Sequence, residues 1–412
     1  MNVFTRADIL LPNEELLERW PVIACDQFTS DPEYWNRMRR FADGVPSAMH
    51  LILPEAELGS EDEVQKVASI HETMEQYLEQ GLLQTFPNSY IYVERTLQNG
   101  MVRPGLIGAV DLEKYDYHHD SVSLIRATEK TVLERIPPRQ RVRRGAALEL
   151  PHIMMLCDDD RKVLIEPVQA VKDTLPKLYE LDLPEGGGHI VGYLVSGETA
   201  DAFDSRLDAY AGTLGDKYSD LDGAKVLLAV GDGNHSLATA KSCYEELKQA
   251  QPDADWSAYP ARYALVELEN IHDPSQQFEP IHRVVMRTDA RKLLADLQTI
   301  CEPGGYPVSW IMGKERGVLE LKRSLGELDV AVLQNFLDAW LKENTGVTDY
   351  IHGEDEVASL AMQENTLGLL LQPMSKSQLF RGVIAGGILP RKTFSMGHAR
   401  EKRYYLEGRK IK

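Results

Sequence analysis

Cysteine is scarce in this 412-residue chain, and its spacing says more than its number. The four cysteines are spread from position 25 to position 301 and form no C-x-x-C pair. A structural zinc site and a disulfide framework are therefore not expected. A reducing cytoplasm is the expected compartment.

Long apolar runs and an excess of positive charge are also missing. No stretch approaches the roughly 20 apolar residues that span a bilayer, and the first residues lack the apolar core of a signal peptide. The chain has 45 Lys and Arg against 64 Asp and Glu, so its formal net charge is -19. Neither nucleic acid nor an anionic membrane is expected as its main partner.

The two common glycine-rich phosphate motifs, G-x-x-x-x-G-K-[ST] and G-x-G-x-x-G, do not occur. Residues 225–241 instead read as a buried strand, a polar loop and a helix starting at about Ser236. A helix N-terminus presents unpaired N–H groups and partial positive charge, so such a loop can hold an anion. The residues predicted to bind phosphate here are Gly231, Gly233, Asn234 and Ser236, with Asp232 and His235 placed for phosphate or proton chemistry. The alternative is an ordinary turn with Asn234 or Ser236 as the helix cap.

Other local patterns predict a mixed architecture. A capping box at residues 60–63 starts a helix that stops at Gly81, and Asn-Gly at 99–100 joins two strands, 90–97 and 102–112, into a hairpin. A second hairpin is predicted from 152 to 167, with residues 158–161 as a solvated turn. A further helix is expected from about 329 to 343. Irregular alternation of strands and helices favours an α+β fold with a mixed sheet. A break at 252–255 suggests two regions, 1–255 and 256–412.

Residues 126–144 are unusually basic for so acidic a chain. Pro137 and Pro138 are expected to keep a helix from running through the segment, and alternating arginines on an extended chain would then share one side. Such a row suits a polyphosphate, because each guanidinium can bind two oxygens. The phosphate-binding residues predicted here are Arg126, Lys130, Arg135, Arg139 and Arg141. The alternatives are an edge strand protected by charge, and neutralisation of the arginines by nearby Asp and Glu.

An acid also ends a short apolar strand near the N-terminus, where Asp26 follows residues 21–25. Catalytic carboxylates often occupy such a position, but acids also cap helices and form turns there. Asp26 is therefore a candidate catalytic residue, and the sequence does not show whether it converges with the basic segment or with the Gly231 loop.

Several of these pieces together resemble the bacterial and archaeal family called domain of unknown function 1015. The matching stretches are 24–26, 126–131, 135–139, 148–152 and the Gly231 loop, with weaker support from 279–283 and 389–392. That family is similar in turn to the ParB/sulfiredoxin superfamily, which includes free-serine kinases. Members bind nucleotide phosphates with an Asp-Gly-His-His-Arg loop. The resemblance implies a ParB/sulfiredoxin-like core with large insertions and a C-terminal extension.

The same resemblance implies an activity. The expected reaction is phosphoryl transfer between ATP or ADP and a small hydroxy amino acid, most simply free serine. Asp232 would hold Mg²⁺, and Asp26 or His235 would accept the substrate hydroxyl proton. Ser236 replaces the loop arginine of the relatives, so the basic segment is expected to supply that charge. Hydrolysis of phosphoserine and nucleotide-dependent regulation without catalysis are the alternatives.

Overall fold

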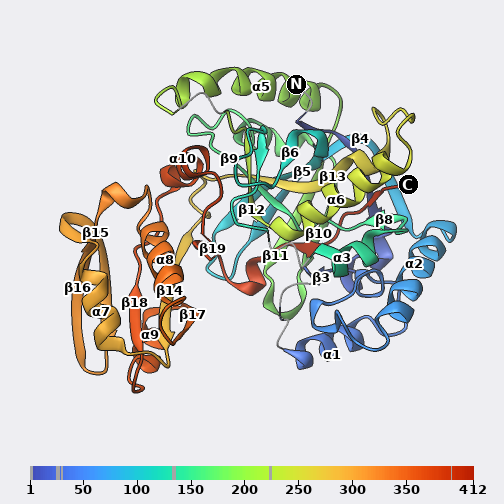
Figure 1. Cartoon of the computed structure of the whole chain (residues 1–412). Helices are drawn as coiled ribbons and strands as arrows, with labels where there is room; N and C mark the ends of the chain where they lie inside the picture. Colours follow the sequence, from blue (N-terminus) through green and yellow to red (C-terminus); the bar gives the residue numbers. More distant parts are fainter. Residues whose placement is uncertain (1–2, 25–27, 29–30, 132–135, 222–224, 391) are drawn as a thin grey trace.

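The computed structural model describes residues 3–24, 28, 31–131, 136–221, 225–390 and 392–412. Two large sheets are flanked by helices, which confirms the predicted α+β class with a mixed sheet (Figure 1). Within the described ranges, no helix has both the length and the apolar composition needed to cross a membrane.

The larger sheet has eleven strands, mostly antiparallel, with parallel pairs around β9, β12 and β7. Its path runs through β10 (Lys177–Asp182), β11 (His189–Val195), β4 (Leu83–Thr96), β5 (Val102–Asp111), β13 (Tyr263–Asn270), β9 (Met154–Cys157), β12 (Leu228–Asp232), β7 (Ile125–Arg126) and β6 (Tyr115–Asp116). Beside this path, β1 (Phe4–Thr5) pairs with β5 and β2 (Ala7–Pro12) pairs with β4.

Both faces of this sheet are covered, and β4 shows how the sequence achieves it. Successive side chains on a strand point to opposite faces. Tyr90 and Tyr92 accordingly enter one apolar cluster, whereas Ile91 and Val93 enter the other. The first cluster includes side chains of α5 (Gly197–Lys217) and α6 (Asn234–Ala250), and the second includes side chains of α1 (Pro32–Phe41) and α2 (Glu63–Glu79).

The smaller sheet has six strands and forms a separate lobe (Figure 1). Its strands are β16 (Glu315–Leu321), β15 (Cys301–Met312), β18 (Leu367–Leu370), β14 (Phe278–Met286) and β17 (Val347–His352), with β19 (Phe394–Met396) added to the start of β14. The remaining helices are α3 (Ile136–Arg143), α4 (Glu166–Gln169), α7 (Ala290–Gln298), α8 (Asp329–Trp340), α9 (Glu354–Leu360) and α10 (Lys376–Gly386).

The last segment of the chain returns from the small lobe to the large one. After β19, β20 (Tyr404–Tyr405) pairs with β3 (Val22–Ile23), and β21 (Arg409–Lys410) pairs with β8 (Leu148–Glu149). The division between the sheets does not fall at residue 255, because β13 still belongs to the large sheet. The C-terminal segment thus brings late residues back beside early ones.

One of the two predicted hairpins is confirmed, the one with the stronger local sequence signal. The Asn-Gly hairpin is present, with Thr96 opposite Val102 across β4 and β5. The hairpin predicted for 152–167 is wrong, since β9 pairs with β12 and β13 and is followed by helix α4. Its predicted solvated turn is only partly so: Asp160 and Arg161 are exposed in a turn, but Asp158 and Asp159 are buried, and Asp159 accepts a hydrogen bond from the Leu164 N–H at 2.8 Å. Asp158 and Asp159 therefore stabilise the loop between β9 and α4.

Charged side chains are buried on one face of β13. Arg103 Nε lies 3.2 Å from Glu269 Oε1, and Arg403 Nη1 lies 3.2 Å from Glu267 Oε2. Burial raises the pKa of Glu269 to about 7, more than the positive charge of Arg103 can offset, and the neighbouring Glu267 raises that pKa further. These pairs join β5 and the C-terminal segment to β13 through the core.

Candidate functional site

The loop between β12 and α6 begins its helix earlier than the sequence pattern indicated. Gly233 adopts a left-handed conformation with φ of 86°, and α6 starts at Asn234. A Cβ at this position would also lie 3.1 Å from Ile153, so both backbone and packing favour glycine. The tight turn places the first residues of the 17-residue helix α6 directly after the end of β12.

Two polar side chains of the loop stabilise the turn itself. Asp232 Oδ1 accepts a hydrogen bond from the Gly233 N–H at 3.0 Å. Asn234 Oδ1 accepts one from the Thr128 N–H at 3.2 Å, and the Thr128 hydroxyl donates to the Val230 carbonyl at 2.6 Å. Asn234 therefore anchors the start of α6 to the segment that follows β7.

A polar cavity of about 550 Å³ opens over this loop. The C-terminal segment forms much of its opposite wall. Its charged and titratable lining residues are Glu55, Glu129, Arg139, Asp232, His235, His352, Lys392, His398 and Lys402. Lys402 is largely buried, and its Nζ lies 3.6 Å from Asp232 Oδ2. Two lysines, an arginine and a helix N-terminus thus face one space, an arrangement that favours an anionic ligand.

Glu129 is the carboxyl group of the cavity best suited to hold or release a proton. Burial raises its pKa, Asp232 adds to the rise, and Lys392 opposes it. Its Oε1 accepts a hydrogen bond from the Lys392 N–H at 3.2 Å. Partial burial and the charge of Lys392 also lower the pKa of His352, which favours the neutral imidazole at this wall.

The predicted row of arginines on an extended strand is wrong. Residues Ile136–Arg143 form α3, because the two prolines stand in its first turn, where a missing N–H costs no helical hydrogen bond. Helical spacing then points the arginines in different directions, and each reaches a glutamate. The pairs are Arg139–Glu55 at 2.6 Å, Arg141–Glu63 at 2.6 Å, Arg143–Glu149 at 2.7 Å and Arg144–Glu246 at 2.6 Å. Neutralisation by acids, left open above, is what occurs.

Arg139 is the only described member of the predicted basic set that lines the polar cavity. Arg126 is buried outside the cavity lining, where Nε donates to the Ser123 carbonyl at 3.1 Å and Nη1 to the Val383 carbonyl at 3.3 Å. Arg141 reaches α2 instead, and Lys130 is exposed outside the cavity. Arg135 lies outside the described residues, as does the candidate catalytic Asp26.

Of the predicted loop residues, Gly231, Asp232, Asn234 and His235 line the polar cavity. Packing favours glycine at position 231, since a Cβ there would lie 2.6 Å from Met396 Sδ and 3.0 Å from Leu156 Cγ. Ser236 lines a second, smaller cavity of about 150 Å³, which shares Glu55 and Arg139 with the first. The polar cavity and the mainly apolar one therefore adjoin at Glu55 and Arg139, and the start of α6 lines both.

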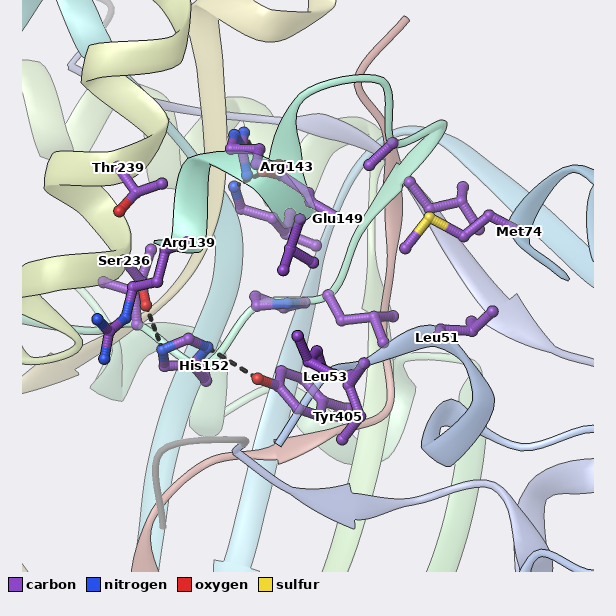
Figure 2. Close-up of a pocket in the computed structure, with 18 of the residues that line it drawn as sticks. Leu51, Leu53, Met74, Arg139, Arg143, Glu149, His152, Ser236, Thr239 and Tyr405 are labelled. Carbon is purple, nitrogen blue, oxygen red and sulfur yellow. Dashed lines mark hydrogen bonds and ion pairs between the residues drawn. The ribbon is translucent and has the colours of Figure 1, made fainter. Parts of the chain in front are cut away.

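Ser236 belongs to a chain of three side chains at the wall of the smaller cavity (Figure 2). Its Oγ lies 2.5 Å from His152 Nε2, and His152 Nδ1 lies 3.0 Å from the Tyr405 hydroxyl. Figure 2 shows Arg139 beside the Ser236–His152 pair. Leu53 and Tyr405 contribute apolar surface on the same side.

Sequence reasoning missed most of the residues that complete these cavities. Glu129, His152 and Lys392 stand in the stretches that carried the family resemblance, but the sequence predicted only a structural role for His152 and none for Glu129 or Lys392. Lys402 and Tyr405 gave no local signal. They reach the site only because the C-terminal segment returns to the large sheet.

A metal site made by protein side chains alone is not found, since the described residues hold no group of three or more His, Cys, Asp or Glu placed around one ion. Asp232, the predicted Mg²⁺ ligand, nevertheless puts a carboxylate in the polar cavity. One or two carboxylates plus substrate phosphates are the usual ligands of Mg²⁺. The donor set fits an ion that arrives with a phosphate ligand.

The chain matches a known protein family. The family described as "Protein of unknown function (DUF1015)" matches residues 5–384. No curated protein matches the sequence.

Solved structures with similar folds include SbnI with a C-terminal truncation from Staphylococcus aureus, with 10% identity, a TM-score of 0.36, and coverage of 73% of this chain and 82% of that one. A free serine kinase in complex with AMP has 9% identity, a TM-score of 0.37, and coverage of 74% and 91%. A conserved hypothetical protein from Pyrococcus furiosus has 10% identity, a TM-score of 0.33, and coverage of 72% and 90%. All three TM-scores lie below 0.5, so no activity is inferred from them.

Proposed function

Since this chain belongs to the DUF1015 family of proteins of unknown function, we propose its activity from the site itself: phosphoryl transfer between a nucleotide (ATP or ADP) and a small hydroxy amino acid, with free serine as the expected acceptor. The observation that carries the proposal is the convergence of Lys392, Lys402 and Arg139 on the start of α6. Phosphoryl transfer depends mainly on positioning and on neutralising the transferred group, and this cavity supplies both.

In this proposal, the cationic residues and the N-terminus of α6 bind the phosphates. The backbone after Gly233 presents the N-terminal end of α6, and Lys402 from the C-terminal segment and Arg139 from α3 add charge. Mg²⁺, held by Asp232 together with the phosphates, would neutralise further charge on the transferred group. Three cationic side chains thus face the same cavity as the carboxylates of Glu55, Glu129 and Asp232.

Glu129 is the residue proposed to accept the proton of the attacking hydroxyl, with His235 as the second candidate. A raised pKa improves a carboxylate as a base, and positioned bases contribute roughly 10² to 10⁴-fold to rate. The mixed lining also suits a zwitterionic amino acid, because acids can meet its ammonium group and lysines its carboxylate. The choice of serine follows from the sequence resemblance to a superfamily that includes free-serine kinases. Asp26 stays a candidate from the sequence alone.

The direct test is to incubate the full chain with serine, Mg²⁺ and either ATP or ADP, and to measure phosphoserine by mass spectrometry. Formation of phosphoserine with one nucleotide, lost in Glu129→Gln, is the expected result. No product with either nucleotide would contradict the kinase proposal. Phosphate release from phosphoserine alone would favour the hydrolase. Nucleotide binding without any turnover would favour a regulatory protein.

A further inference from the structure

The Ser236–His152–Tyr405 chain has the arrangement of an activated hydroxyl. The three side chains come from α6, from the segment between β8 and β9, and from β20. With Nδ1–H of His152 donated to the Tyr405 hydroxyl, Nε2 is left to accept the proton of the Ser236 hydroxyl. A nucleophile, a base and a group that orients the base therefore stand in sequence.

The surroundings of Ser236 suit a negatively charged group on its oxygen. Ser236 is the third residue of α6, where the helix favours negative charge. Arg139 lines both cavities and lies beside the Ser236–His152 pair (Figure 2). Leu53 and Ile153 belong to the apolar lining of the smaller cavity. A phosphate on this hydroxyl would be neutralised and shielded.

We propose that Ser236 is a catalytic nucleophile that takes the terminal phosphoryl group of a nucleoside polyphosphate before the group passes to the acceptor. The inference rests on the proposed function and adds a covalent intermediate to it. In the first step a bond forms between Ser236 Oγ and the terminal phosphorus. The bond from that phosphorus to the bridging oxygen breaks, the nucleotide leaves one phosphate shorter, and the Ser236 proton moves to His152 Nε2.

The second step regenerates the hydroxyl. The acceptor oxygen attacks the phosphorus of phosphorylated Ser236, and its proton passes to the Glu129 carboxylate. The bond between phosphorus and Ser236 Oγ breaks, and the His152 imidazolium returns its proton to that oxygen. Each transfer balances without a further reactant. In this scheme Tyr405 is a positioning residue, because it acts on the substrate only through His152.

The competing explanation is a structural brace, since the same hydrogen bonds tie α6 to the C-terminal segment. A brace predicts that Ser236→Ala lowers the melting temperature but that no phosphate is ever found on Ser236. The two explanations differ in a covalent product, which can be sought in the unaltered protein. Loss of folding in a variant therefore cannot hide the answer.

The experiment uses the full chain with Mg²⁺ and no acceptor, in separate reactions with ATP, ADP, GTP and CTP labelled on the terminal phosphate. We expect one nucleotide to label the protein, with peptide mapping to Ser236. His152→Gln should slow labelling roughly 100-fold or more, as expected for removal of a positioned base. Tyr405→Phe should slow it less and shift its pH profile. Ser242→Ala on the same helix is the matched control and should label normally.

Three outcomes would overturn the inference, and they are distinguishable. Phosphoserine formed from serine, with no label on Ser236 and no ADP–ATP exchange in the absence of serine, would leave the proposed function standing and remove the intermediate. No label together with no nucleotide-dependent thermal stabilisation would remove both. Label at another serine would also overturn it.

Discussion

Lys402 Nζ lies 3.6 Å from Asp232 Oδ2, which couples the returning C-terminal segment to the loop before α6. The lysine side chain is only 11% exposed. A charge that is already partly desolvated and held at a cavity wall can contact an anionic ligand with little further ordering.

Lys402→Met should therefore weaken nucleotide binding. Hydrogen bonds to charged groups contribute about 1.5–3 kcal/mol, which corresponds to roughly a 10- to 100-fold increase in Kd. Isothermal titration with ATP and ADP measures the change. Lys314→Met, at an exposed turn between β15 and β16, is the control and should bind as the wild type does. Equal affinities for the two variants would exclude Lys402 from the ligand site.

Arg139 and Arg141 offer a matched pair. Both are on α3 and both contact a glutamate at 2.6 Å, but only Arg139 lines the polar cavity. Arg139→Met should raise the Kd for nucleotide roughly tenfold or more, whereas Arg141→Met should leave it unchanged. Equal losses in the two variants would mean that α3 acts through general charge and not through a specific contact.

Glu129 should control the acidic side of the pH–rate profile. Burial raises the pKa of Glu129 above the ordinary glutamate value of 4.5. The ionised carboxylate that can accept a proton therefore forms only at a pH above that value. Activity should rise with pH as Glu129 ionises. Glu129→Gln should lower kcat by roughly 10² to 10⁴-fold and remove this rise. A Gln variant that keeps both kcat and the acidic limb would exclude Glu129 as the base.

Glu269 should make stability depend on pH. Its folded-state pKa is raised to about 7 from an ordinary value of 4.5, so the folded protein binds more protons than the unfolded chain between these values. Its contribution to the free energy of unfolding is full below pH 4.5 and declines as the pH rises towards 7.

Urea titrations at several pH values should show this slope, and Glu269→Gln should make it shallower. Glu61→Gln, at an exposed position before α2, should leave the slope unchanged. An identical slope in Glu269→Gln and wild type would mean that another group titrates in this range.

Prediction from sequence succeeded where the signal was local. The Asn-Gly pair specified the hairpin of β4 and β5, and the pattern at 225–241 specified β12, the polar turn and α6. It failed at residues 139–143, where prolines were expected to exclude a helix but instead begin one. Turn and helix-start preferences act over only a few residues, and a proline can either begin a helix or end one.

The sequence by itself determined the family, the mixed architecture and the loop that begins α6. Only the tertiary structure decided which charges meet there. Arg141 lies near Arg139 in the chain yet reaches a different partner, because helical spacing turns it towards α2. Lys402 is distant in the chain yet reaches Asp232, because strand β20 pairs with β3 and brings the C-terminal segment back. The site is made by long-range pairing, and no short-range pattern encodes that convergence.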